Sequence, residues 1–206
     1  YFYPDLSKNY QITQYELPLG LQGSLDIGDK KIGITRVHIE EDPASLVHPG
    51  SIATSNFVLI DYNRSGHPLC EIVTEPEMTS PEEAREFMKR LITLLKYLNI
   101  FHPNGIIKAD ANVSIKESGY TRVEIKNITG FKEIERALKH EVERKNAEFH
   151  DGNKIHQETR GWDADTGITY PLRTKETEDD YGYIIDPDLV VTDISEDWVK
   201  KTKKSL

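Results

Sequence analysis

Two carboxylates on neighbouring stretches of the sequence are the residues best suited to chemistry. Glu71 stands between the apolar residues of the run 69–73, and Glu40 directly follows the β-rich run 32–39. A carboxylate buried among apolar side chains is costly unless it is paired, hydrogen-bonded or bound to a metal. Magnesium is usually held by one or two carboxylates together with water and phosphate oxygens. We therefore predict that Glu40 and Glu71 are metal ligands on adjacent strands.

The histidines add little to this prediction. His38 has the same strand parity as Glu40, but a single histidine is more often a structural residue than a ligand. The chain has seven histidines, and the other six show no spacing typical of a zinc site.

A second polar group is expected on the two predicted strands at 106–116 and 121–128. Side chains alternate across a strand, so one face should be apolar and the other polar. The polar face is either a solvated surface with cross-strand ion pairs, or a floor that receives a phosphorylated substrate and its metal. The apolar face would carry Ala111, Val113, Ile115, Val123 and Ile125, and the polar face Asp110, Asn112, Ser114, Arg122, Glu124 and Lys126.

Arg160 and Arg173 lie on the two arms of a hairpin predicted over 154–173, with its turn at 163–167. Arginine binds phosphate or carboxylate through two parallel hydrogen bonds, so the pair is a candidate anion clamp. An equally good interpretation is that these arginines pair with the acidic run 176–180.

Strands and helices must position these residues. Short β-rich runs at 32–39, 57–62 and 69–73 predict strands. A helix should begin after Ser80, because Ser80 can cap it, a proline follows, and apolar residues then recur every three or four positions. A second helix is predicted over 131–149, and Ser195 should cap a closing helix. Strands in runs with two intervening helices predict an α+β fold, a largely antiparallel sheet with helices on one face.

Composition excludes several classes of protein. The 206 residues carry 26 basic and 35 acidic side chains, a net charge of −9, so any nucleic-acid contact must be local. No apolar run is long enough to span a membrane. The single cysteine, Cys70, favours a reducing, cytoplasmic setting. No glycine-rich turn of the Rossmann or P-loop kind is present.

Nine short motifs, in order along nearly the whole chain, closely resemble the B-subunit family of aspartyl/glutamyl-tRNA amidotransferases. They are YFYPDL (1–6), YQITQY (10–15), HIEED (38–42), DYNRSG (61–66), EIVTEP (71–76), DANVS (110–114), VEIKN (123–127), QETR (157–160) and DPDL (186–189).

The resemblance implies a catalytic cradle similar to glutamine synthetase and the guanidino kinases, binding ATP and Mg²⁺. It implies an enzyme, a carbon–nitrogen ligase with glutamine as amido donor. Such an enzyme phosphorylates the side-chain carboxylate of mischarged Asp-tRNA or Glu-tRNA, and ammonia then displaces the phosphate to give the amide. The implied partners are an amidase (A) subunit, a small C subunit and the mischarged tRNA, with no membrane.

The motifs match Glu40 and Glu71 to the carboxylates that bind the metal in this family. They match four further residues to positions that line or border the cradle: Glu124, Lys126, Arg160 and Arg173. We expect residues 1–194 to form the cradle, without the family's N-terminal strand that completes the metal site, and 195–206 to begin a helical domain. Two alternatives remain open: the related E-type subunit for Glu-tRNA, and a non-catalytic tRNA-binding scaffold. The preference for Asp-tRNA or Glu-tRNA and the ammonia route are not readable from this sequence.

Overall fold

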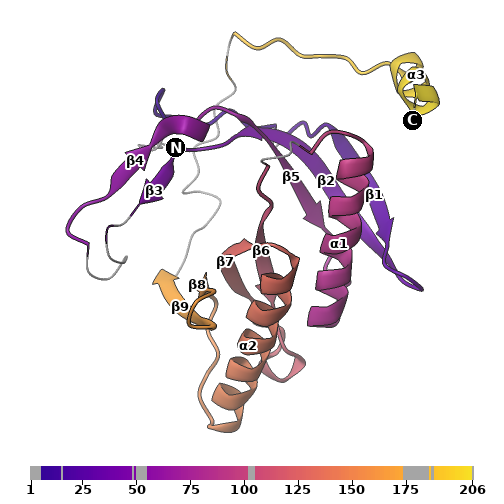
Figure 1. The fold of residues 1–206 in the computed structure, drawn as a ribbon. Coiled ribbons are helices and arrows are strands. Elements are labelled where there is room, and N and C mark those ends of the chain that lie inside the picture. The colour runs from indigo at the N-terminus through magenta and orange to yellow at the C-terminus, as the bar shows by residue number, and fades with distance from the viewer. Residues whose placement is uncertain are drawn as a thin grey trace. The chain divides into compact units, whose positions relative to one another are not determined.

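The computed structural model describes residues 6–14, 16–47, 49, 55–101, 105–173, 186 and 188–205, and of Arg173 it describes the backbone alone. These residues divide into two compact units. The first comprises the described residues within 1–23, 34–74 and 177–206, and the second those within 24–33 and 75–176. Figure 1 labels the strands and helices of both.

A three-stranded sheet dominates the first unit. Its strands are β1 (Gly20–Asp26), β2 (Lys31–Glu41) and β5 (Pro68–Thr74), in the order β1-β2-β5, with the β1–β2 tip belonging to the second unit. Strands β2 and β5 are antiparallel, and His38 lies opposite Glu71. The β-branched residues that fill β2 favour an extended backbone, which explains its length of 11 residues.

A separate two-stranded ribbon also belongs to the first unit. It pairs β3 (Ser45–Val47) with β4 (Leu59–Asp61) in antiparallel register, with Leu46 opposite Ile60. A short 3₁₀ turn, η1 (Tyr62–Arg64), follows and is capped by the Asp61 carboxylate. Both faces of the ribbon carry exposed apolar side chains.

The second unit contains a four-stranded sheet in the order β6-β7-β8-β9. The outer pairs are antiparallel, whereas β7 and β8 run parallel because helix α2 carries the chain from one to the other. A 3₁₀ turn, η2, lies between β6 and β7. The bounds are β6 (Lys108–Val113), η2 (Lys116–Ser118), β7 (Val123–Thr129), α2 (Phe131–His150), β8 (Glu158–Asp163) and β9 (Ile168–Arg173).

Helix α2 packs against strands β6, β7 and β9 and encloses the apolar core of the second unit. The apolar face predicted for the strand pair is confirmed, since all five of its residues are buried. Burial of aliphatic side chains of this size is the main stabilising contribution in a small unit. The most deeply buried members of this core are Val123, Ile125, Ile128 and Ala137.

Helix α1 (Pro81–Tyr97) begins as the sequence predicts, with the Ser80 side chain accepting a hydrogen bond from the Glu83 backbone N–H. It packs against α2, and ion pairs join the two helices between Arg85 and Glu135 at 2.9 Å and between Lys139 and Glu82 at 2.8 Å. The apolar residues of α1 that are buried are Ala84, Phe87, Met88 and Leu91.

Helix α3 (Glu196–Ser205) closes the described chain, and the Ser195 hydroxyl accepts a hydrogen bond from the Trp198 backbone N–H at 3.2 Å. None of its described residues is buried. Across the described ranges, every helix is too short or too polar to cross a bilayer.

The predicted α+β class is confirmed, with mainly antiparallel strand pairs. The predicted strands, both long helices, the hairpin turn and the closing helix occur close to their expected positions. The structure differs from the prediction in two ways: the strands of the described residues form three sheets rather than one, and β7 and β8 pair in parallel. The division into a cradle at 1–194 and a helical start at 195–206 stays a prediction.

Candidate metal centre and polar clusters

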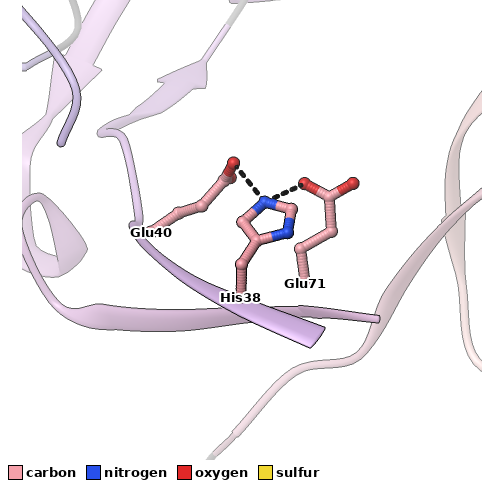
Figure 2. Close-up of side chains that lie close together, drawn as sticks. All are labelled: His38, Glu40 and Glu71. Atoms are coloured by element: carbon pink, nitrogen blue, oxygen red, sulfur yellow. Dashed lines mark hydrogen bonds and ion pairs between the residues drawn. The ribbon is translucent and has the colours of Figure 1, made fainter. Parts of the chain in front are cut away.

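His38, Glu40 and Glu71 form one cluster in the first unit, as Figure 2 shows. The His38 Nε2 atom lies 2.9 Å from Glu40 Oε1 and 3.2 Å from Glu71 Oε2. The three candidate ligand atoms all lie within 4.8 Å of one another. Among the described residues, this is the single group of histidine, cysteine or acidic side chains that is arranged to hold an ion.

Strand geometry explains why these three residues meet. His38 and Glu40 are two positions apart on β2, so they point to the same face of the sheet. The antiparallel register places Glu71 of β5 directly opposite His38. Cross-strand neighbours in such a pair have side chains within contact distance. The predicted convergence of Glu40 and Glu71 from adjacent strands is therefore present, whereas their role as ligands stays a prediction.

The burial of Glu71 differs from what the sequence predicts. The sequence predicts a buried Glu71, but its side chain is 45% exposed, whereas that of His38 is 1% exposed. The reason is that β5 is an edge strand of its sheet and its described residues are at most half-buried. Partial burial, followed by the neighbouring negative charge of Glu40, still raises the pKa of the Glu71 carboxyl, while His38 opposes the shift.

The cluster fits a divalent cation. Two oxygens bound to one magnesium ion at about 2.1 Å are at most about 4.2 Å apart, so a small closure lets the three atoms share an ion. Two carboxylates suit magnesium or manganese, and the imidazole nitrogen favours a transition metal. The other ring nitrogen, His38 Nδ1, is buried without a hydrogen-bond partner among the described residues, so the ring is held through the nitrogen that faces the carboxylates.

The polar face of the second unit's sheet carries a separate cluster around Glu124 and Lys126 of β7. Lys126 Nζ lies 3.9 Å from Glu124 Oε1, and the Thr159 hydroxyl donates to Glu124 Oε2 at 3.3 Å. Asp110 on β6 joins them: burial raises the pKa of its carboxyl, the Lys126 ammonium opposes the shift and the Glu124 charge adds to it.

A backbone irregularity shapes this cluster. The β6–β7 register shifts at Asp110, where Asn127 adopts a left-handed conformation with φ of 67°. An extra residue inserted into one strand bends the strand and redirects its side chains. The Asn127 backbone N–H donates to the Asp110 carboxylate and, like the Lys126 ammonium group, opposes the rise in its pKa that burial causes.

Arg160 belongs to the opposite face of that sheet. It lies opposite Ile125 in the parallel register, on the face covered by α2. Its guanidinium donates to the Thr169 hydroxyl at 2.9 Å, to the Thr169 carbonyl at 2.8 Å and to Glu158 at 3.0 Å. Glu141 Oε2 lies 3.6 Å from Arg160 Nε. These contacts hold β8, β9 and α2 together, so the structure does not bring Arg160 to the face of Glu124 and Lys126.

The predicted arginine clamp is described only in part. The Cα of Arg173 lies opposite that of Thr159, but the Arg173 side chain and the acidic run 176–180 lie outside the described residues. Arg160 pairs with Glu158 and Glu141. The proposed roles of Arg160 and Arg173 toward a substrate stay predictions.

Several polar residues are missed by the sequence patterns. Glu141 and Lys145 are fully buried on α2, in line with the apolar residues Ile134 and Ala137. Lys145 donates to the Thr121 carbonyl at 2.6 Å, and burial lowers the pKa of its ammonium group. Their spacing of three and four residues from the apolar positions is the signal that places them on the buried side.

Comparison with known proteins adds an independent observation. The family model for the GatB/GatE catalytic domain matches residues 1–200. The B-subunit of the aspartyl/glutamyl-tRNA(Asn/Gln) amidotransferase from Sulfolobus acidocaldarius is 50% identical over 214 residues, covering all of this chain and 45% of the relative. Its counterparts from Methanosarcina barkeri and Thermus thermophilus are 49% and 45% identical, again over the whole chain and 42% and 44% of the relative. The chain therefore spans less than half the length of these relatives.

Proposed function

Because the chain belongs to the GatB/GatE catalytic domain family, we propose that it is the kinase and transamidase module of a tRNA-dependent amidotransferase. In this reaction a side-chain carboxylate of Asp-tRNA or Glu-tRNA attacks the γ-phosphorus of ATP, and ADP leaves. Ammonia then displaces the phosphate from the acyl phosphate and forms the amide. Activation is needed because a carboxylate is a poor electrophile until one of its oxygens becomes a phosphate leaving group.

The observation that carries the proposal is the convergence of Glu40 and Glu71 beside His38. These three residues would hold a divalent ion, which we propose to be Mg²⁺. When bound, such an ion supplies positive charge that neutralises phosphate oxygens during phosphoryl transfer. The residues themselves contribute two negative charges and one nitrogen on a single sheet face, which is a donor set for a cation rather than for a phosphate alone.

Glu124 and Lys126 are proposed to act on the polar face of the other sheet. The Lys126 ammonium group, half-buried beside Glu124 and Asp110, supplies a positive charge that can approach a phosphate oxygen. Arg160 supports that face from the opposite side of the sheet through its bonds to Thr169. We keep Arg173 as a candidate anion ligand.

The proposal extends to partners and location. An amidase subunit that releases ammonia from glutamine, together with a small third subunit, would complete the enzyme in the cytoplasm. The net charge of −9 favours a local contact with tRNA rather than a continuous one along this chain.

The test uses the full-length protein assembled with its partner subunits and supplied with Asp-tRNA and Glu-tRNA. We expect Glu71→Gln and Glu40→Gln to abolish both ADP release and amide formation while tRNA binding persists. Glu143→Gln, on an exposed position of α2, is the matched control and should keep normal activity. Normal amide formation by either cluster variant would refute the catalytic assignment.

The same assay separates the alternatives. A tRNA-binding scaffold would bind the mischarged tRNA but release no ADP with any of these variants or with the unaltered protein. An E-type subunit would amidate Glu-tRNA and leave Asp-tRNA unchanged.

A further inference from the structure

A short segment near the start of the described chain lies along β2 beside the candidate metal cluster. We call residues 8–14 the strap. Its attachment to the strand is partly main-chain: Thr13 forms an antiparallel bridge with Glu40, and the Gln14 backbone N–H donates to the Ile39 carbonyl at 3.3 Å. The Gln14 side chain accepts a hydrogen bond from the Ile39 backbone N–H at 3.0 Å. The strap and the cluster belong to the same unit.

Two strap side chains contact the carboxylate of Glu40, one on each oxygen. The Thr13 hydroxyl donates to Oε1 at 3.1 Å, and the Gln11 amide donates to Oε2 at 3.3 Å. The same Gln11 amide donates to the Glu41 carbonyl at 2.8 Å, which fixes the position of the Gln11 side chain. With His38 also against Oε1, the Glu40 carboxylate is held from three directions.

Glu71 lacks this support. Among the described residues, its hydrogen-bond and ion-pair partners are His38 and Glu40, and the charge of Arg36 also acts on its carboxyl. None of the hydrogen bonds of the described strap residues reaches Glu71. The Glu71 side chain is 45% exposed, compared with 16% for Glu40. One carboxylate of the cluster is therefore held in place before any ion arrives, while the other can move.

We propose that Gln11 and Thr13 are positioning residues that orient the Glu40 carboxylate for a divalent cation. This inference rests on the proposed function, because it takes the cluster to be a metal site. A carboxylate oxygen has two lone pairs, so Oε1 can accept the Thr13 hydroxyl and still bind an ion. Residues that hydrogen-bond to a metal ligand fix its orientation, and their loss typically weakens metal binding by about 10- to 100-fold.

The experiment measures Mn²⁺ binding to the full-length protein by electron paramagnetic resonance of the free ion. Thr13→Val keeps the shape of the side chain but removes the hydroxyl, and Gln11→Met removes the amide. We expect each to raise the Mn²⁺ dissociation constant by about 10-fold or more. Thr13→Ser restores a hydroxyl and should bind Mn²⁺ almost as well as the unaltered protein.

Gln14→Met is the matched control, since it removes a hydrogen bond between the strap and β2 that does not involve the cluster. It should leave Mn²⁺ affinity unchanged. In the assembled enzyme, Thr13→Val should raise the metal concentration needed for half-maximal amide formation and leave the rate at saturating metal nearly normal.

Three results would overturn the inference. Equal weakening by Gln14→Met would mean that the strap acts only through its attachment. Unchanged Mn²⁺ affinity in Thr13→Val and Gln11→Met, with binding lost in Glu40→Gln and Glu71→Gln, would refute the positioning role alone. Unchanged affinity in Glu40→Gln and Glu71→Gln as well would refute the metal site and the inference that depends on it.

Discussion

The second unit is organised around an apolar core, whereas the first unit, which carries the candidate metal cluster, has very little core among its described residues. In the second unit the sheet residues Val123, Ile125 and Ile128 are completely buried. In the first unit the buried apolar residues that the structure describes are Leu6 and Ala44, and the largest fully buried side chain is that of His38.

The buried residues that stabilise the fold and the residues of the candidate metal cluster therefore lie mainly in different units. Burial of aliphatic side chains stabilises a fold wherever it occurs, at about 25 cal/mol per Å² of apolar surface. The first unit relies instead on polar contacts between the strap and β2, and it leaves the apolar side chains of the β3–β4 ribbon exposed. We therefore expect substitutions in the second unit to change the free energy of unfolding, and substitutions in the first unit to change ligand binding.

The largest effect is expected from a pair of isoleucines. Ile125→Ala removes a fully buried side chain from β7 and should lower the free energy of unfolding by about 4 kcal/mol, because it leaves a cavity. Ile60→Ala in β4, where the side chain is 39% exposed, should cost less than about 1 kcal/mol. Urea unfolding followed by circular dichroism measures both. Equal losses would break the distinction between the two units.

A buried charge in the second unit gives the next largest effect. Glu141 is fully buried and binds Arg144 and the Thr169 hydroxyl, the latter at 2.8 Å. Glu141→Leu leaves Arg144 and Arg160 short of a partner and should destabilise the protein by about 3 kcal/mol. Glu143→Leu, at an exposed position two residues along the same helix, controls for the change in charge and should be nearly neutral. The measurement is the unfolding midpoint of each variant. An unchanged midpoint in Glu141→Leu would contradict the prediction.

The smallest effect concerns pH. Hydrogen bonds from Lys139 and then Arg85 lower the pKa of the Glu135 carboxyl from its ordinary value of 4.5, and the hydrogen bond from Lys30 does the same for Glu83. The folded state therefore binds these protons more weakly than the unfolded state. Their stabilising contribution is complete above pH 4.5 and is lost as pH falls through the lowered folded-state pKa values.

Thermal unfolding between about pH 6 and about pH 3 tests this expectation. Glu135→Gln should make the melting temperature fall slightly less steeply with acidification, and about 1 M NaCl should reduce the difference because salt screens exposed charges. A steeper fall in Glu135→Gln would reverse the sign of the predicted contribution.

Local patterns predict the fold well where neighbouring residues decide the structure. The start of α1 follows from Ser80 and the proline after it, because a cap satisfies backbone groups within one turn. The apolar face of the β6–β7 pair follows from strict alternation, which places every second side chain on one side. No local pattern predicts the parallel pairing of β7 with β8, because it depends on where α2 returns the chain.

The candidate site is predicted in part for the same reason. Glu40 and Glu71 stand out as carboxylates in or directly after short β-rich runs, but the sequence favours a structural role for His38 and a buried Glu71. Arg160 is expected to border the cradle, whereas its partner Glu141 on α2 draws it to the face of the sheet opposite Glu124. Burial and facing depend on which strands lie at the edge and on where helices pack, and neither is encoded in spacing alone.

By itself, the sequence determined the α+β class, the strands and helices, the family and the two acidic residues of the cluster, because propensity, alternation and motifs are local properties. Tertiary structure alone decided that His38 joins those two residues and that Gln11 and Thr13 hold one of them. Each of these depends on contacts between segments distant in sequence, such as Thr13 and Glu40, which are 27 positions apart. Such contacts form only when strand register and helix packing bring the segments together.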